Sequence, residues 1–404
     1  MKRLFTKTTL WIIGWLPALG LILVLGKASS NAAVSEPFIY TASPDCMQFS
    51  SCELQTSLGF DNEVYAVGIG ASITNNLTAT VYLPIVANNF PLAIGHVDMP
   101  WLPQDITVVN GHAYVALCEG IPENPYVFRG GLQIVDISSP TLPSKLGSYV
   151  GGYCVWETAV NGKYAYVADV SSRGGSLMIV DISDPISPSL VSSWSLFGGV
   201  SNVAVAEGHA YVGLGYWGAG LIVLDVSIPT NPTVVREHPV SEFVEDIVVH
   251  TNRIYLAASN GLHILDRTTL NEIGFYPAPE RLSSVAVQGE YVYVVSRYGN
   301  LYIVDISDLA NPTEIGSYDI TTDYSPVDIA VVGKYLYFPA GYNGVRILDV
   351  SAPEAPIEVA FYSMPGAAYS VAVDWNYAYV ANSDGVSIFA SLRSTNHTSL
   401  LHSE

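Results

Sequence analysis

A short apolar segment that ends in aspartate occurs six times in this chain of 404 residues. The first copy is GGLQIVDISSP (residues 130–140), and later copies include GNLYIVDISDL (299–309). The aspartates recur at intervals of 45, 44, 41, 39 and 44 residues, at Asp136, Asp181, Asp225, Asp266, Asp305 and Asp349. A period of this length indicates that the chain is an array of one small structural unit.

Two further motifs precede the aspartate in each unit, and both occur seven times. One resembles SNVAV (201–205) and the other EGHAYVGL (207–214). The segments are short, rich in Val, Ile and Tyr, and separated by turns that contain Gly, Asn or Pro, which is typical of strands. Four strands in about 40–45 residues make one β-propeller blade. The sequence therefore predicts an all-β fold, a single β-propeller with seven four-stranded blades, and leaves six and eight blades as alternatives.

The ends of the array suggest how the ring closes. The last unit stops near Leu392 after three strands, whereas NNFPLAIGHVDMP (88–100) resembles the fourth-strand segment LANPTEIGSYDIT (309–321). We therefore expect an N-terminal strand to complete the last blade of a propeller that spans residues 88–392. Residues 33–87 would be an N-terminal extension or linker, in which 61–86 could form a degenerate eighth blade, and 393–404 a C-terminal tail.

The repeats LQIVDIS, LYIVDIS and VRILDVS, each followed by a Pro-containing turn and a GSY-like strand, resemble the LVIVD-repeat family of β-propellers. The resemblance covers roughly residues 88–392. It implies an exported protein of the bacterial type without a defined reaction. Two departures are visible, because Arg267-Thr268 replaces Ile-Ser after Asp266 and the last unit has no aspartate.

The first 32 residues predict export. Lys2, Arg3 and Lys7 precede an apolar run, and small residues follow it, so the segment is a signal peptide or an uncleaved N-terminal anchor. We expect a secreted or cell-surface protein, with the membrane contacted only through an uncleaved segment. Four cysteines fit an oxidising compartment, and we expect the pairs Cys46–Cys52 and Cys118–Cys154.

Charge excludes one class of partner. The chain has 16 basic and 36 acidic residues and a net charge of −20. Such a charge repels nucleic acid and favours cations or cationic partners.

The repeated aspartates allow two interpretations. Each could bind a cation, or each could end the third strand and accept backbone N–H groups of the following turn. Copies at equal blade positions are spread around a ring and cannot converge on one site, so we expect turn caps.

The entries of the first strands converge on the central channel of a propeller. This register is occupied by Asp105, Glu157, Asn202, Asp246, Ser284, Asp328 and Ser370. Oxygen ligands of this kind suit Ca²⁺, so Asp105, Glu157, Asn202, Asp246 and Asp328 are candidate metal ligands, and Ca²⁺ is the only cofactor considered. The alternative is a solvated polar channel.

Aromatic side chains occupy the loops between second and third strands, on the face where the first strands begin. The candidate ligand-binding residues are Tyr126, Tyr216, Trp217, Tyr298 and Tyr342 in these loops, together with Trp156 near the channel mouth. No Ser-His-Asp arrangement, GxSxG or P-loop is present. We expect a non-enzymatic binding or scaffold propeller that presents an aromatic face to protein or carbohydrate ligands. The alternative is a Ca²⁺-dependent lactonase-like hydrolase or lyase with its metal at the channel mouth.

Overall fold

The computed structural model describes residues 93–392, with gaps at 122–123, 172–173, 197–198, 216–219, 241–242 and 321–327, and six short strands nearer the N-terminus. The chain forms two compact units, Met1–Phe90 and Pro91–Glu404. Strands of the first unit pair as β1–β4, β2–β3 and β5–β6, and their bounds are β1 Thr9–Ile12, β2 Ile22–Gly26, β3 Pro37–Thr41, β4 Cys52–Gln55, β5 Gly70–Ser72 and β6 Thr80–Tyr82. No helix among the described residues is long and apolar enough to cross a membrane.

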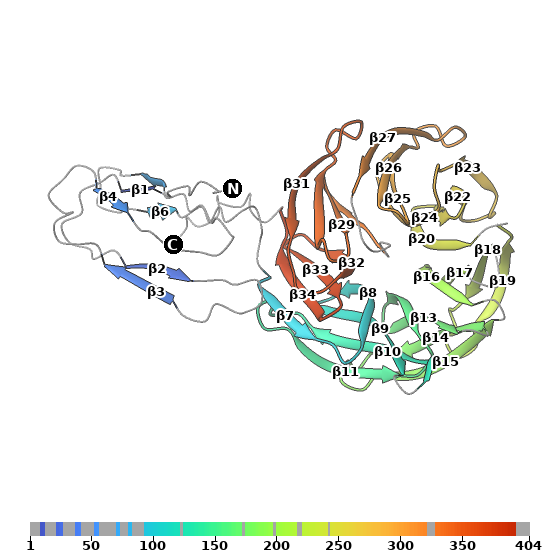
Figure 1. Ribbon diagram of the computed structural model, residues 1–404. Coiled ribbons are helices and arrows are strands. Elements are labelled where there is room, and N and C mark those ends of the chain that lie inside the picture. The colour runs from blue at the N-terminus through green and yellow to red at the C-terminus, as the bar shows by residue number, and fades with distance from the viewer. Residues whose placement is uncertain are drawn as a thin grey trace, which may run out of the picture. The chain divides into compact units, whose positions relative to one another are not determined.

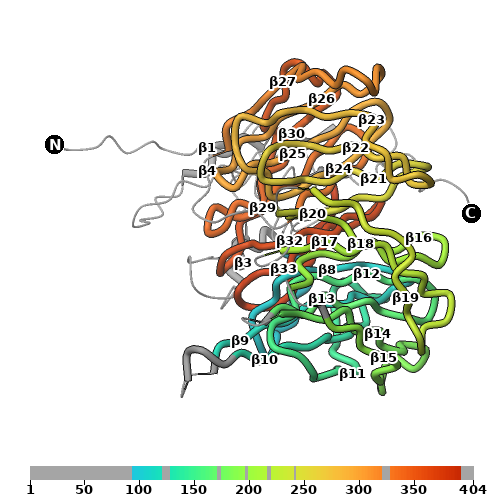
Figure 2. Tube along the Cα trace, turned by 90° about the vertical axis from the view of Figure 1, so that its right-hand side faces the viewer, coloured from blue at the N-terminus to red at the C-terminus, as the bar shows by residue number. Residues whose placement is uncertain are grey.

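The second unit is a ring of seven four-stranded antiparallel sheets (Figure 1, and from the side in Figure 2). Blade 1 contains β8 (Leu102–Val109), β9 (His112–Ile121), β10 (Asn124–Asp136) and β11 (Ser144–Val150). Blade 2 contains β12 (Val155–Asn161), β13 (Tyr164–Ser171), β14 (Gly174–Asp181) and β15 (Ser189–Leu196). Blade 3 contains β16 (Val200–Ala206), β17 (His209–Leu214), β18 (Gly220–Asp225) and β19 (Thr233–His238).

Blades 4 to 6 repeat this order. Blade 4 contains β20 (Val244–His250), β21 (Arg253–Ala258), β22 (Gly261–Asp266) and β23 (Glu272–Tyr276). Blade 5 contains β24 (Leu282–Gln288), β25 (Tyr291–Ser296), β26 (Asn300–Asp305) and β27 (Thr313–Asp319). Blade 6 contains β28 (Ala330–Val332), β29 (Tyr335–Pro339), β30 (Val345–Asp349) and β31 (Ile357–Tyr362).

Blade 7 joins the two ends of the ring. Its first three strands are β32 (Ala368–Val373), β33 (Tyr377–Asn382) and β34 (Gly385–Ala390), and its fourth is β7 (Gly95–Asp98). β7 lies beside β34 (Figure 1), with Gly95 opposite Ile388 and Asp98 opposite Gly385. The predicted closure by an N-terminal strand is confirmed. The eighth blade is not formed, because β5 and β6 pair only with each other.

The core lies between the blades. Seven buried clusters each combine side chains of two neighbouring sheets, as where Tyr255 and Ile264 of blade 4 pack with Val292 and Val294 of blade 5. A second or third strand is covered on both faces, and its sequence is therefore a continuous apolar run rather than an alternating one. The stability of each blade depends on its neighbours.

The six repeated aspartates cap the turns that follow the third strands, as expected. The Oδ1 atom of each accepts a backbone N–H two residues later, at 2.9 Å (Asp136–Ser138), 2.8 Å (Asp181–Ser183), 2.9 Å (Asp225–Ser227), 3.0 Å (Asp266–Thr268), 2.8 Å (Asp305–Ser307) and 2.9 Å (Asp349–Ser351). This is the Asx turn that a short carboxylate makes with its own backbone. Bonds from the Ser307 N–H and hydroxyl lower the pKa of Asp305.

Removing one cap should have a modest and specific cost. We expect Asp305→Ala to lower the free energy of unfolding by about 1 kcal/mol, because one charge-assisted backbone bond is lost. Asp305→Asn retains an acceptor oxygen and should recover most of this loss. Urea denaturation of the two variants checks the prediction, and equal midpoints for them would contradict it.

In four of the seven blades a glycine of the fourth strand lies against the turn of the next blade, and these glycines are Gly95, Gly147, Gly274 and Gly316. A Cβ atom on Gly316 would overlap the carbonyl oxygen of Pro353, which belongs to the capped turn of the following blade. At Gly147 the backbone N–H donates to the Pro185 carbonyl at 2.9 Å. The corresponding positions opposite Ile179, Val223 and Ile347 carry Ser192, Arg236 and Ala360. Ser192 contacts the Pro-containing turn of blade 3 by donating from Oγ to the Pro229 carbonyl at 2.6 Å. Arg236 and Ala360 precede blades 4 and 7, where the Pro-containing turn is replaced or absent.

Candidate functional site

Four carboxyl groups meet at the centre of the ring. A cavity of about 290 Å³ is lined by the beginnings of first strands, including Asp105, Glu157, Asp246 and Asp328. Its remaining wall is mostly aliphatic, with side chains such as Ile247, Val285 and Ile329. The structure thus brings together four of the five predicted metal ligands. The fifth, Asn202, is buried and donates from Nδ2 to Glu157 Oε2 at 2.6 Å.

The same register holds neighbouring blades together. At four positions of the register, a side-chain oxygen accepts a hydrogen bond from the next blade. The donor is the backbone N–H of the residue that follows the register position there, at 3.0 Å (Asp105 to Thr158), 2.7 Å (Asp246 to Val285), 3.1 Å (Ser284 to Ile329) and 3.4 Å (Ser370 to Ile106). These four bonds join blade 1 to 2, blade 4 to 5, blade 5 to 6 and blade 7 to 1. We call these contacts the inter-blade bonds. Sequence reasoning found the register but not this use of it.

Hydroxyl groups complete the network. Ser370 Oγ donates to Asp105 Oδ1 at 3.0 Å, while Thr158 donates to Oδ2 from both N and Oγ1. Asp246 accepts from Ile247 N on Oδ1, at 2.6 Å, and from Ser284 Oγ and Val285 N on Oδ2. Both carboxylate oxygens of Asp105 and of Asp246 therefore accept hydrogen bonds from the protein itself.

Burial raises the pKa values of all four acids, and repulsion by neighbouring carboxylates raises those of Glu157, Asp246 and Asp328 further. Burial is the largest cause for Glu157 and Asp328, whose pKa values lie well above the usual range, and the charges of Asp246 and Asp105 raise them further. Burial raises the pKa of Asp246 to about 7 although its three donors oppose the shift. The pKa of Asp105 is also raised by burial. These acids have no cationic partner among the ion pairs of the described residues.

The arrangement does not resemble a metal cage. Within residues 93–392, outside the gaps, no three acidic, histidine or cysteine side chains are placed to hold one metal ion. A Ca²⁺ site needs six to eight oxygens directed at one point. Asp105 and Asp246 instead direct their oxygens at neighbouring strands. As placed, these side chains do not fit a Ca²⁺ ion.

The structure describes three of the six predicted aromatic side chains. Tyr298 and Tyr342 lie in loops between second and third strands, and each is 72% exposed. Trp156 lies in β12 and is 37% exposed. Tyr126 is within β10, but its side chain, like Tyr216 and Trp217, lies outside the described residues.

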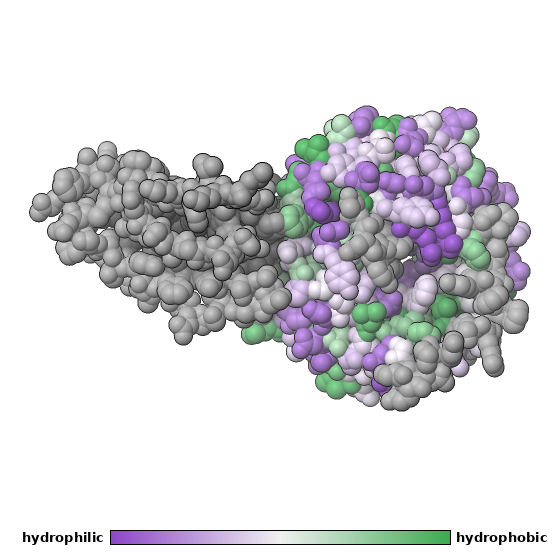
Figure 3. Space-filling view, in the orientation of Figure 1, coloured by the Kyte–Doolittle hydropathy of each residue, from purple (hydrophilic) through white to green (hydrophobic). Residues whose placement is uncertain are grey.

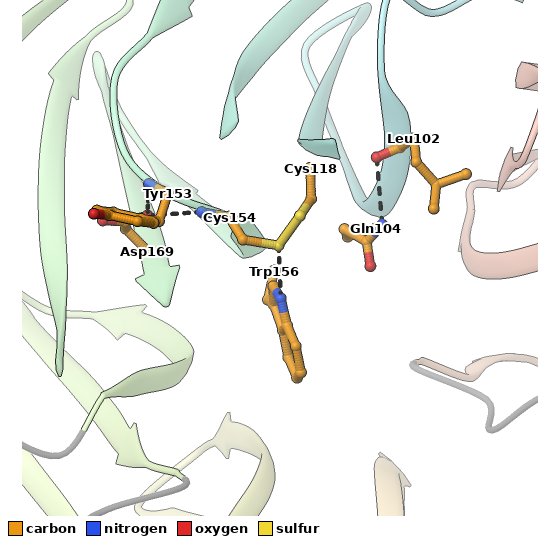
Figure 4. The surroundings of a disulfide bond; sticks show 7 residues. All are labelled: Leu102, Gln104, Cys118, Tyr153, Cys154, Trp156 and Asp169. Atoms are coloured by element: carbon orange, nitrogen blue, oxygen red, sulfur yellow. Dashed lines mark hydrogen bonds between the residues drawn. A yellow bond between two sulfur atoms is a disulfide. The ribbon is translucent and has the colours of Figure 1, made fainter. Parts of the chain in front are cut away.

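A disulfide joins blades 1 and 2, as predicted. Cys118 and Cys154 are bonded, with their Cα atoms 4.6 Å apart (Figure 4). The Trp156 indole N–H donates to Cys154 Sγ at 2.9 Å, and Asp169 Oδ1 accepts from the N–H groups of Tyr153 and Cys154 at 2.6 and 3.1 Å. Cys46 lies outside the described residues, so its predicted bridge to Cys52 is not described.

The bridge should contribute measurably to stability. It connects positions 36 residues apart, and a loop of that size is worth about 2–4 kcal/mol in the free energy of unfolding. We expect the double variant Cys118→Ala, Cys154→Ala to show this loss in chemical denaturation under oxidising conditions. Added reductant should then destabilise the wild-type protein and leave the double variant unchanged. Equal denaturation midpoints for the two proteins without reductant would contradict the prediction.

The repeats identify the family. The model of the LVIVD repeat matches residues 103–150, 152–195, 197–238, 281–320, 326–363 and 365–388. This chain belongs to the LVIVD-repeat family. The matches correspond to every blade except blade 4, whose turn has Arg267-Thr268 after Asp266. The aspartate that recurs in six blades of this chain is thus the turn cap, whereas the residue at the channel register varies from blade to blade.

Solved structures of similar fold are propellers. The WD40 β-propeller domain of Doa1 has a TM-score of 0.60 at 13% identity, covering 76% of this chain and 99% of that one. The computationally designed Ika8 protein has a TM-score of 0.55 at 10% identity, covering 74% and 100%. BamB from Moraxella catarrhalis has a TM-score of 0.51 at 14% identity, covering 74% and 97%. No curated protein matches this chain.

Proposed function

We propose that this LVIVD-repeat propeller is an exported, non-enzymatic binding or scaffold protein. Its binding face is the one that carries the loops between second and third strands, and its ligands are proteins or carbohydrates. The observation that carries the proposal is the exposure of Tyr298 and Tyr342 on neighbouring blades, at 72% each. Aromatic rings left in solvent at loop tips suit stacking on a sugar ring or packing against a peptide.

Two further features support this proposal. In Figure 3 hydrophilic residues gather over blades 4 and 5, whereas apolar and hydrophilic residues are mixed over blades 1 and 2. Export is supported by the charged and apolar N-terminal segment and by the Cys118–Cys154 bridge, which suits an oxidising compartment.

Binding arrays test the proposal directly. The full chain is applied to glycan and peptide arrays beside the variants Tyr298→Ala and Tyr342→Ala. The control is Trp375→Ala, because Trp375 is 69% exposed but lies in the turn between β32 and β33, on the opposite face. We expect the two tyrosine variants to lose signals that the control keeps. Identical profiles for all four proteins would refute the assigned face, and detection of the protein only in the cytoplasmic fraction would refute export.

A further inference from the structure

An apolar patch surrounds the disulfide at the start of the first strands of blades 1 and 2. It consists of Leu102, Tyr153 and Trp156, which are 36%, 45% and 37% exposed, and we call it the disulfide patch. Leu102 is opposite Cys118 in the β8–β9 ladder, and Tyr153 and Trp156 flank Cys154 in the sequence. In Figure 4 the Trp156 indole lies beside the Cys154 sulfur, and its ring extends away from the backbones of both cysteines. The sequence had indicated Trp156 alone.

The backbone of the disulfide patch and its Trp156 ring are held in place by specific bonds. The bridge fixes the two blades to each other, the indole N–H is bonded to sulfur, and Asp169 binds the backbone on both sides of the Tyr153–Cys154 peptide. Apolar side chains that are already ordered lose little conformational entropy when a partner binds. The patch is therefore suited to act as an anchor point of an interface.

The charges around the disulfide patch select the partner. Glu157 follows Trp156 in β12, and its carboxyl lines the cavity with three aspartates that lack cationic partners in the described structure. The arginine nearest the disulfide, Arg129, is paired with Glu119, whereas Arg281 and Arg297 of blades 4 and 5 share the one carboxylate of Glu245. A ligand approaching the disulfide patch on blades 1 and 2 thus meets carboxyl groups without a cationic partner and an arginine that is already paired. Electrostatic complementarity favours a cationic partner.

We propose that the disulfide patch docks a protein segment in which an apolar side chain is adjacent to Lys or Arg. The apolar side chain packs against Trp156 and Tyr153, and the cationic side chain points toward Glu157 at the cavity. Such a cation relieves the repulsion among the four acids, so binding lowers their pKa values and releases protons to solvent. This inference rests on the proposed function and specifies the chemistry of the ligand.

Selection from a displayed library of random peptides tests the inference. The full wild-type chain selects peptides at pH 7.5, and the enriched peptides are then measured against Trp156→Ala, Glu157→Gln and Trp375→Ala. We expect enrichment of Lys or Arg next to an apolar residue, at least about tenfold weaker binding by Trp156→Ala, and weaker binding by Glu157→Gln. Trp375→Ala should bind like the wild type.

Several outcomes would overturn the inference. These are no enrichment, enrichment of neutral or acidic peptides, or equal affinity for Trp156→Ala and Trp375→Ala. Trp156→Phe, which retains an aromatic ring, separates loss of the patch from misfolding, and it should keep most of the affinity. If glycans or uncharged peptides bind through Tyr298 and Tyr342 while basic peptides do not bind, the inference fails and the proposed function stands. If nothing binds through this face, both fail.

Discussion

Raising the pH from about 5 to 8 should lower the thermal denaturation temperature of this protein. The acids of the cavity have folded-state pKa values above those of the unfolded chain, with Asp246 at about 7 instead of 3.8. Between these values the folded protein holds protons that the unfolded chain has released, so a rise in pH favours unfolding. For Asp246 alone the full shift corresponds to a loss on the order of 4 kcal/mol in the free energy of unfolding.

The opposite trend should appear at lower pH. The capping aspartates have lowered pKa values, and the bonds from Lys334 and Ser351 hold that of Asp349 at about 2. A lowered pKa contributes stability above the unfolded value, and this contribution is lost as the pH falls toward the folded value. The maximum of stability should therefore lie in mildly acidic solution, between the two groups of acids.

Denaturation temperatures measured from pH 3 to 9 at constant ionic strength check both trends. The variants Glu157→Gln and Asp328→Asn, which are neutral at every pH, should flatten the decline above pH 5. Asp319→Asn, at the exposed end of β27, is the control and should retain it. A denaturation temperature that is constant or rises between pH 5 and 8 would show that the four acids are not held at raised pKa values.

Adding one methyl group at Gly316 should be among the most destabilising small changes in the molecule. The new Cβ would overlap the Pro353 carbonyl oxygen, so β27 must move away from blade 6. Overpacking of this kind costs about 1–3 kcal/mol, and here it also separates two blades whose side chains form a shared core.

The matched control comes from the next blade. Ala360 has the corresponding position in β31, opposite Ile347, and no Pro-containing turn faces it from blade 7. Ala360→Gly should therefore cost no more than about 1 kcal/mol, which is the usual price of the added backbone freedom. Chemical denaturation compares Gly316→Ala with Ala360→Gly. A smaller loss for Gly316→Ala than for Ala360→Gly would contradict the fit between strand and turn.

The fold could be predicted because each blade repeats the same evidence. A strand that is ambiguous in one unit is recognised because the same pattern occurs in six or seven copies. The last unit lacks a fourth strand, and an additional strand precedes the first unit. Gly316 shows the limit, because its role depends on a turn of the neighbouring blade that no local pattern connects to it.

The site was predicted less completely. Alignment of the repeats placed Asp105, Glu157, Asp246 and Asp328 at one cavity. The alignment could not show whether the carboxylate oxygens face a shared centre or the next strand. A metal site and a set of inter-blade bonds would place the same residues at the same register position and differ only in the direction of the side chains. Tyr153 was missed since nothing in GGYCVWE distinguishes an exposed ring from a buried one.

The pairing of β7 with β34 has a consequence for biosynthesis. His96 and Ser387, which bond across these strands, are 291 residues apart. At about 5–20 residues per second, translation takes roughly 15–60 s to cover that distance. Throughout this interval the first strand of the ring has no partner, and its edge is open to other chains. Export before folding would keep these incomplete rings unfolded until both ends are present.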